Sequence, residues 1–366
     1  MKDKMEEKNI ETQENPNIMN QQTTDQDILL ELDTLIELCN GFGPSSNEEE
    51  IMSIILSKTQ ELNIPSIFDK KGNLTFIKDI DKTDFRVLIA SHVDEIGFIV
   101  AEKIEPSYLK VEPLGSWSVD ILPSTKVLIK TQYGYIKGVF SSVPPHLSNV
   151  SIGKNISDLF VDVSDNFEYV QVGDYIVPDS QVEIMSNSTI VGKAFDNRIG
   201  TYVNYHVLKY VDSQVDVFHA FLVQEELGLR GSKFFAQNNS QFDLIIVIET
   251  TSAETPFSKQ HVSQLGKGPV ITIMDKTYIT NPRLLQIVKE IAALNNIPIQ
   301  FKKPNVGSTD AGALQDIGNV IIISVPARYI HTPYQICSLT DIKNTIKLIS
   351  ALIATPNIEE IYRERL

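Results

Sequence analysis

Residues 87–100 read VLIASHVDEIGFIV, and this stretch decides the fold. Its apolar start is typical of a buried β-strand. The strand-like run stops at Ser91 and His92, and the acids Asp94 and Glu95 follow within three residues. Ligands of open α/β sheets bind at the carboxyl ends of the strands, so this order of residues predicts a polar site at the end of a buried strand.

Three later stretches have the same character, and helical segments alternate with them. The strand-like stretches are DVFHAFLVQEE (216–226), DLIIVIE (243–249) and NVIIISVPARYIH (319–331). We expect helices over 198–211, over 282–294 with Pro282 in the first turn, and over 341–354 with Thr340 as the cap. Strands that alternate with amphipathic helices predict an α/β fold, with a mixed sheet covered by helices on both faces.

Two regions outside this alternation complete the predicted organisation. Two helices precede the first strand, one over 28–38 and one after the break at 41–44, where Ser45 and Glu48 offer a capping box. Residues 117–186 carry short β-branched runs between Gly, Pro and Asp, which predicts a small inserted β-barrel-like domain. The catalytic domain would then comprise 28–116 and 187–366.

Composition excludes several classes of protein. Asp and Glu number 47 against 32 Lys and Arg, and a net charge of −15 without a basic cluster argues against binding to nucleic acid. The apolar runs are far shorter than the roughly 20 residues of a membrane span. The two cysteines, Cys39 and Cys337, cannot form a disulfide framework. Residues 1–27 are rich in Asn, Gln and Glu, which predicts a disordered tail without a secretory signal, and hence a cytoplasmic protein.

The residues that end the apolar runs form a set of possible metal ligands. Two divalent ions need nitrogen and oxygen ligands and a carboxylate that bridges them. We assign His92 and His331 as terminal ligands, and Asp196, which precedes the helix near Arg198, as the bridge. The other ligands are Glu226 and Glu249. Glu225 is left as general base. Asp94 would accept the other ring N–H of His92 and so fix the orientation of its imidazole.

Each of these residues also has an ordinary structural interpretation. His92 with Asp94 could be a surface pair, Glu225 with Glu226 a solvated charge pair, Asp196 a helix cap and His331 a turn residue. Together they are harder to explain by chance, because they stand at four strand ends and one helix start. His206 and His219 read as structural histidines, and His146 and His261 lack this placement.

Seven motifs give the chain a family resemblance. In order they are HVDEIGF (92–98), GSW with LP (115–123), PPHL (144–147), KAFDNRIG (193–200), VQEELGLRGS (223–232), STDAG (308–312) and RYIHTP (328–333). With this set the chain resembles the tetrahedral (TET) aminopeptidase family of dinuclear metallopeptidases, which includes glutamyl and deblocking aminopeptidases and relatives annotated with cellulase activity. The motifs cover nearly all of the chain after residue 28.

The resemblance implies a fold of the zinc-exopeptidase type and the same site residues. His92, Asp196, Glu226, Glu249 and His331 would bind two divalent ions, most often zinc or cobalt, with Glu225 as base and Asp94 supporting His92. The insert would be a dimerisation domain, and the dimers would assemble into a homo-oligomeric dodecamer. Two features depart from the family pattern: Glu249 stands within IETTSAETP, where many members carry Asp or Glu-Gly-Thr, and the N-terminal tail is longer.

The expected activity is metal-assisted removal of N-terminal residues from peptides. Two alternatives remain open from the sequence: a metal-independent glycosidase that uses paired carboxylates, and a catalytically silent peptide-binding protein. The STDAG loop could contact substrate or could be a turn held by Asp310. A preference for acidic residues is hinted at by four cations, Arg198, Arg230, Lys302 and Arg328.

Overall fold

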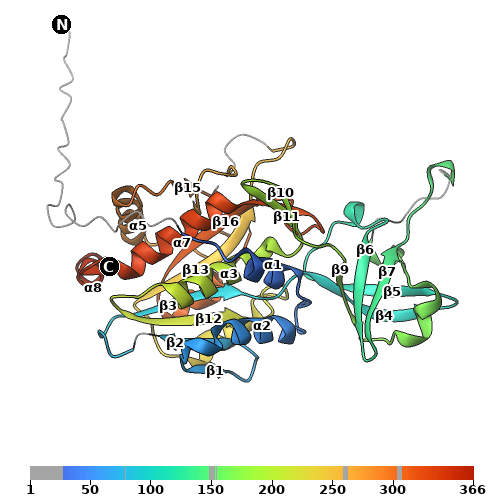
Figure 1. Ribbon diagram of the computed structural model, residues 1–366, viewed down its shortest axis with the longest axis horizontal. Coiled ribbons are helices and arrows are strands. Elements are labelled where there is room, and N and C mark those ends of the chain that lie inside the picture. The colour runs from blue at the N-terminus through green and yellow to red at the C-terminus, as the bar shows by residue number, and fades with distance from the viewer. Residues whose placement is uncertain (1–27, 79, 148–152, 154, 259–262, 303–306) are drawn as a thin grey trace, which may run out of the picture.

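The computed structural model describes residues 28–78, 80–147, 153, 155–258, 263–302 and 307–366. It consists of a large α/β part and a separate six-stranded barrel (Figure 1). The predicted disordered tail, 1–27, and His261 lie outside the described residues.

The large part is built on an eleven-stranded mixed sheet, which confirms the predicted fold class. Its four central strands, β12, β3, β13 and β16, are mutually parallel neighbours. Shorter antiparallel strands extend it on both sides. In spatial order the main path is β1 (Ser66–Phe68), β2 (Leu74–Lys78), β12 (Asp216–Leu222), β3 (Arg86–His92), β13 (Leu244–Ser252), β16 (Asn319–Arg328), β17 (Gln335–Ser338), β11 (Thr189–Gly192) and β10 (Glu183–Ser186). Off this path, β14 (Val270–Ile271) pairs with β16, and β15 (Gln300–Phe301) pairs with β14.

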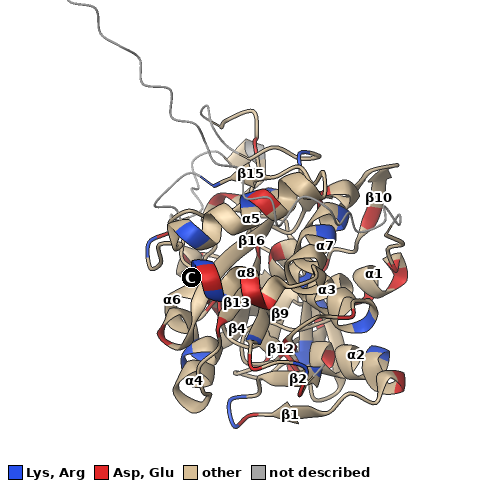
Figure 2. Ribbon diagram, turned by 90° about the vertical axis from the view of Figure 1, so that its left-hand side faces the viewer, with Lys and Arg blue, Asp and Glu red and all other residues tan. Residues whose placement is uncertain are grey.

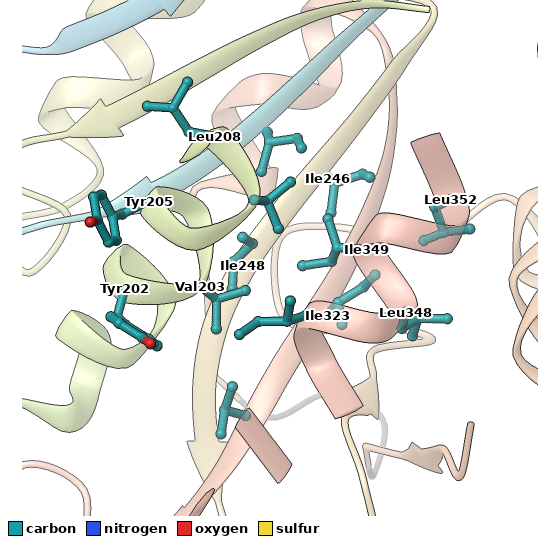
Figure 3. Packing of buried hydrophobic residues seen from close by; sticks show 14 of the residues in the cluster. Tyr202, Val203, Tyr205, Leu208, Ile246, Ile248, Ile323, Leu348, Ile349 and Leu352 are labelled. Atoms are coloured by element: carbon teal, nitrogen blue, oxygen red, sulfur yellow. The ribbon is translucent and has the colours of Figure 1, made fainter. Parts of the chain in front are cut away.

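Helices cover both faces of this sheet, because each central strand is apolar on both sides. In β13, Ile246 and Ile248 belong to the core under α3 and α7, whereas Ile245 and Val247 belong to the core under α4 and α6. Figure 3 shows the first of these cores, where side chains of α3 and α7 meet those of β13 and β16. The helices are α1 (Leu32–Asn40), α2 (Glu49–Thr59), α3 (Phe195–Tyr210), α4 (Arg230–Asn238), α5 (Pro282–Leu294), α6 (Ala311–Leu314), α7 (Leu339–Ala354) and α8 (Ile358–Arg365), and short 3₁₀ turns lie at 60–62, 119–121, 145–147, 156–158, 164–169 and 315–317.

The helix starts differ in part from those predicted. Helix α5 has the predicted bounds, and the Asn281 side chain accepts a hydrogen bond from the N–H of Arg283. Helix α7 begins at Leu339, so Thr340 lies inside it and does not cap it. The predicted capping box before α2 is wrong, because the hydroxyl of Ser45 donates to Asp94, far along the chain. A capping-box pattern cannot reveal such a distant acceptor.

The barrel is closed by six strands around an apolar interior that includes Phe98, Val111, Ile129 and Phe140. It starts earlier than the predicted insert at 117, and strand β10, inside the predicted insert, belongs to the large sheet. The sequence stays largely apolar from β3 into the first strand of the barrel. Hydropathy alone therefore does not show where the large sheet ends and the barrel begins. The strands are β4 (Gly97–Ile104), β5 (Tyr108–Leu114), β6 (Lys126–Thr131), β7 (Gly134–Phe140), β8 (Val161–Asp162) and β9 (Tyr175–Pro178).

Charged side chains of both signs share the outer helices. Figure 2 shows acidic and basic residues together on α5 and α8. Arg365 of α8 lies 2.6 Å from a carboxylate oxygen of Glu290 on α5, so an ion pair joins the last helix to the main body. Among the helices that the structure describes, none has the length and apolar character needed to cross a bilayer.

Candidate active site

The parallel strands bring the predicted site residues to one edge of the sheet. Strand β3 pairs Ala90 with Val247 of β13, so His92 and Glu249 follow side by side two residues later. Strand β12 pairs Leu222 with His92, and Glu225 and Glu226 come just after that pair. His331 follows the end of β16 at Arg328. The common strand direction is therefore what gathers residues far apart in the chain.

Asp196 reaches the same edge from the start of α3. The backbone is not helical at Asp196 and Asn197, so the regular helix begins at Arg198, as predicted. The Asn197 side chain donates to the carbonyl of Ile248 at 2.8 Å, and the N–H of Asp196 donates to Gln335 at 3.1 Å. These bonds tie the start of α3 to β13 and to β17.

Five side chains form two groups of metal-ligand type that share Asp196. His92 Nε2 lies 3.7 Å from an oxygen of Asp196 and 3.7 Å from an oxygen of Glu249. His331 Nε2 lies 3.3 Å from the other oxygen of Asp196 and 3.2 Å from Glu226. Within each group the ligand atoms lie within 4.8 Å of one another. All five residues predicted as ligands are thus brought together.

Glu225 and Asp94 lie beside these groups. Glu225 lines the same cavity but belongs to neither group. Asp94 is buried, with one oxygen 3.4 Å from His92 Nδ1. It also accepts hydrogen bonds from the N–H groups of Glu225 and Glu226 at 3.0 and 3.2 Å. Asp94 therefore contacts both the histidine and the turn that carries the two glutamates.

The site concentrates negative charge away from water. Burial raises the pKa of Glu225 well above its usual value, His92 opposes this, and Glu249 and Asp310 add to it. Burial lowers the pKa of His331, but hydrogen bonds to Asp196 and Glu226 outweigh it and raise that pKa to about 11. One oxygen of Glu249 is buried without a hydrogen-bond partner. The residues fit divalent cations, which would satisfy this oxygen and replace the protons that the acids otherwise hold.

A cavity of about 440 Å³ opens onto these residues. Among the described residues that line it, Lys302 is the one lysine or arginine. Arg198 is fully buried elsewhere, Arg328 bonds to Glu254, and Arg230 is exposed at the start of α4 and does not line the cavity. The lining residues are His92, Ser116, Asp196, Glu225, Glu226, Gly228, Leu229, Glu249, Thr250, Thr251, Ser252, Ser263, Lys302, Gly307, Ser308, Thr309, Ile330 and His331. Of the four cations considered for substrate preference, Lys302 is therefore the one that lines the cavity.

The STDAG loop lies at the cavity, but its turn is not held in the predicted way. Ser308 and Thr309 line the cavity. Asp310 is buried, and its backbone carbonyl accepts the first hydrogen bonds of α6. Neither carboxyl oxygen of Asp310 has a hydrogen-bond partner of normal geometry, and burial raises its pKa to about 6 against the lowering effect of the nearby Ser232 hydroxyl. The side chain thus does not hold the turn by hydrogen bonds.

The sequence interpretation missed supporting residues, and two other histidines are structural as predicted. Ser116 contacts the site through its carbonyl oxygen, 3.2 Å from His331 Nδ1, and Gln335 holds Asp196. Ser116 stands in the GSW motif, which was a usable signal, whereas Gln335 has no local signal. His206 packs in α3 beside Tyr202, and His219 Nδ1 lies 2.9 Å from Asn204.

Comparison with known proteins shows the family of the chain. FrvX of Escherichia coli K12 is 28% identical over 91% of this chain and 97% of its own length. A TET aminopeptidase from the marine sediment archaeon Thaumarchaeota archaeon SCGC AB-539-E09 superposes with a TM-score of 0.84 and 31% identity, over 90% of this chain and 97% of that one. PhTET1-12s, solved as a dodecamer, has a TM-score of 0.81 and 28% identity, over 89% and 100%. The model of the M42 glutamyl aminopeptidases matches residues 72–348, a span that holds every side chain of the two ligand groups, and the chain therefore belongs to the M42 family.

Proposed function

We propose that this M42 peptidase is an aminopeptidase that uses two divalent metal ions, zinc or cobalt, held by the two ligand groups. The observation that carries the proposal is the sharing of Asp196 by these groups. His92 and Glu249 would bind one ion, and Glu226 and His331 the other, with one oxygen of Asp196 directed to each side. A carboxylate shared between two ligand groups would hold two divalent ions close together, as two-metal hydrolysis requires.

When bound, divalent ions at such a site polarise the scissile carbonyl and lower the pKa of water. Glu225 is the group of this chain that can accept and return a proton. It lies outside both ligand groups, and burial raises its pKa well above the usual value, which makes it a better proton acceptor than an exposed glutamate. Its backbone is held by the bond from its N–H to Asp94. Glu225 would take a proton from the attacking water and pass it to the leaving amine.

The acid-rich cavity also favours action at the N-terminus of a peptide. A free peptide carries an ammonium group there, and the buried carboxylates provide its counter-charge. A carboxyl terminus would meet repulsion instead. Thr251 and Ser252 among the lining residues would offer hydroxyl groups to a peptide backbone, whereas the Thr250 hydroxyl already donates to the carbonyl of Phe195.

The test of this function is Glu225→Gln in the metal-reconstituted protein. We expect turnover of aminoacyl p-nitroanilides to fall by about 10²–10⁴-fold, the usual contribution of a general base. Metal content and thermal stability should stay near the wild-type values, because the substitution preserves shape and touches no ligand. Glu183→Gln, at an exposed position on β10, is the matched control. Near-normal turnover of the Glu225 variant would refute the assignment of the base.

The two alternatives fit the site less well. A glycosidase needs paired carboxylates across a sugar bond, and this gives no reason for two imidazoles packed against them. A silent binding protein gives no reason for a buried carboxylate oxygen without a partner, as in Glu249, which costs stability. Hydrolysis of a β-glucan that survives chelation would favour the first alternative, and fewer than two ions per chain in a metal analysis would favour the second.

We further propose that the barrel mediates self-association. Tyr133, Tyr169 and Val172 are exposed on it although they are large and apolar. Tyr133 and Tyr169 pack edge to face, with ring centroids 5.7 Å apart, so they present a preformed apolar surface. The solved relative PhTET1-12s is a dodecamer. We therefore expect this chain to form dimers that assemble into a dodecamer, which light scattering after size-exclusion chromatography would test.

A further inference from the structure

The turn that carries Glu225 and Glu226 is held by side chains instead of by the sheet. Four successive N–H groups leave strand β12 and each donates to a side-chain oxygen. In chain order, Val223 donates to Asn73 at 3.0 Å, Gln224 to Glu48 at 3.1 Å, Glu225 to Asp94 at 3.0 Å and Glu226 to Asp94 at 3.2 Å.

These bonds compensate for a backbone that has left the regular ladder. Gln224 has a positive φ of 56°, so the chain turns sharply just before the two glutamates. Buried N–H groups need acceptors, and here the acceptors come from three separate segments. Asn73 precedes β2 and Asp94 follows β3, but Glu48 lies ahead of every strand, at the start of α2.

The Glu48 side chain is buried beside this turn. It is 6% exposed, and the oxygen that accepts from Gln224 also accepts from the N–H of Ser46 at 2.8 Å. Burial and the nearby Asp94 raise the pKa of Glu48 to about 7, while the N–H donors oppose this rise. A buried acid beside a second acid destabilises the fold, so stability alone does not explain why Glu48 stands here.

The loop that contains Glu48 is itself fastened to the catalytic segment. The hydroxyl of Ser45 donates to Asp94 at 2.6 Å. The N–H of Glu95 donates to the carbonyl of Gly43 at 3.0 Å, and the N–H of Ser45 donates back to Glu95 at 3.3 Å. The loop thus holds Asp94 through Ser45, and the glutamate turn through Glu48.

We propose that Glu48 is a positioning residue: its side-chain oxygen fixes the N–H of Gln224 and so sets the direction in which Glu225 and Glu226 enter the cavity. Glu48 itself reaches neither substrate nor ligand atoms; it acts through the backbone of the turn. Its effect on turnover rests on the proposed function, whereas its effect on the turn does not.

The experiment compares Glu48→Ala, Glu48→Gln and Glu49→Ala in the full-length, metal-reconstituted protein. Glutamine keeps an oxygen in the required place, and Glu49 is the exposed neighbour at the start of α2. We expect Glu48→Ala to lower kcat by about 10–100-fold with KM within about twofold, since a misdirected base affects the transition state more than binding. Glu48→Gln should restore kcat to within about threefold of wild type, and Glu49→Ala should change nothing.

Hydrogen exchange gives a second readout that needs no catalysis. In Glu48→Ala, amides 223–229 should exchange faster than in wild type, while both other variants keep wild-type protection. Should Glu48→Ala fail to fold, Glu48→Asp replaces it, because the shorter side chain withdraws the oxygen and should show the same two effects. Unchanged kcat with unchanged exchange would overturn the proposal, and so would a glutamine variant as impaired as the alanine one. A wild-type protein that hydrolyses no peptide would refute the proposed function, and the exchange data would still decide the role of Glu48.

Discussion

Glu95, Lys193 and Arg198 form a buried charge cluster that allows a sharp test of its energetics. Lys193 Nζ lies 2.7 and 2.9 Å from the two carboxylate oxygens of Glu95, and Arg198 Nη2 lies 3.3 Å from one of them. All three side chains are almost completely buried. Both cations also donate to backbone carbonyls, Lys193 to Gly41 and Arg198 to Gly43. The cluster thus joins the N-terminal helices to the segment after β3.

The perturbations are Glu95→Gln and Lys193→Met, and the balance of charge predicts unequal effects. Glu95→Gln leaves two buried cations without their anion, which should cost about 3–5 kcal/mol of unfolding free energy. Lys193→Met leaves one anion paired with one cation. Burial lowers the pKa of Lys193 although Glu95 opposes this, so the ammonium is only partly compensated, and its removal should cost about 1–2 kcal/mol, mostly for the lost hydrogen bonds.

Guanidinium unfolding of the metal-free protein at one fixed protomer concentration, followed by circular dichroism, measures both variants. Metal is removed because ion binding would add its own stabilisation to the folded state. Glu95→Gln should unfold at a clearly lower denaturant concentration than Lys193→Met with a similar m-value. Equal denaturation midpoints of the two variants, or a lower midpoint for Lys193→Met, would refute the reasoning that the fold depends more on the Glu95 carboxylate than on the Lys193 ammonium.

Three further outcomes are expected. Hydroxyl and ammonium donors from α3 outweigh burial and lower the pKa of Glu31 from 4.5 to about 2, so its stabilisation is complete above about pH 4.5 and is lost as the pH falls toward 2. Because the Glu31 side chain is 27% exposed, Glu31→Gln should cost only about 1–2 kcal/mol at pH 7, and the difference from wild type should shrink in unfolding measurements at pH 3.5. Gly231→Ala should lower the melting temperature, because its Cβ would lie 2.1 Å from the carbonyl oxygen of Val223, and an unchanged melting temperature would contradict this packing. Lys302→Glu should shift preference from glutamyl toward lysyl p-nitroanilide by about tenfold or more in kcat/KM, whereas Lys267→Glu, at an exposed position, should not.

The sequence was sufficient for the central sheet and for the ligand groups because both depend on the same local signal. Buried parallel strands are apolar along their whole length, so the first polar residue marks the strand end. Parallel strands share a direction, and hence His92, Glu226 and His331 had to meet at one edge. Helix α5 was predicted with its observed bounds, since Pro282 gives a local start signal.

What the sequence could not supply are contacts that depend on register and on distant partners. The barrel boundary was misplaced because strands β4 and β5 read like a continuation of the main sheet. Ser45 and Glu48 were interpreted as a local cap, while their hydroxyl and carboxyl groups bond to Asp94 and to the turn after β12. Arg198 was counted as a candidate for substrate recognition, although it is fully buried among backbone carbonyls. A cation has the same appearance in sequence whether it faces a cavity or a core.

The six residues from His92 to Gly97 explain why so many separate segments influence one site. His92 belongs to a ligand group, Asp94 bonds to the glutamate turn, and Glu95 joins the buried charge cluster. Gly97 begins the barrel, where a Cβ would lie 2.5 Å from the carbonyl oxygen of Ile176, and its own carbonyl accepts from the Trp117 indole at 3.0 Å. Because these contacts are buried and closely spaced along one short segment, a displacement of the N-terminal helices or of the barrel must move His92 or Asp94 as well. The precision of the site therefore depends on both flanking parts of the molecule.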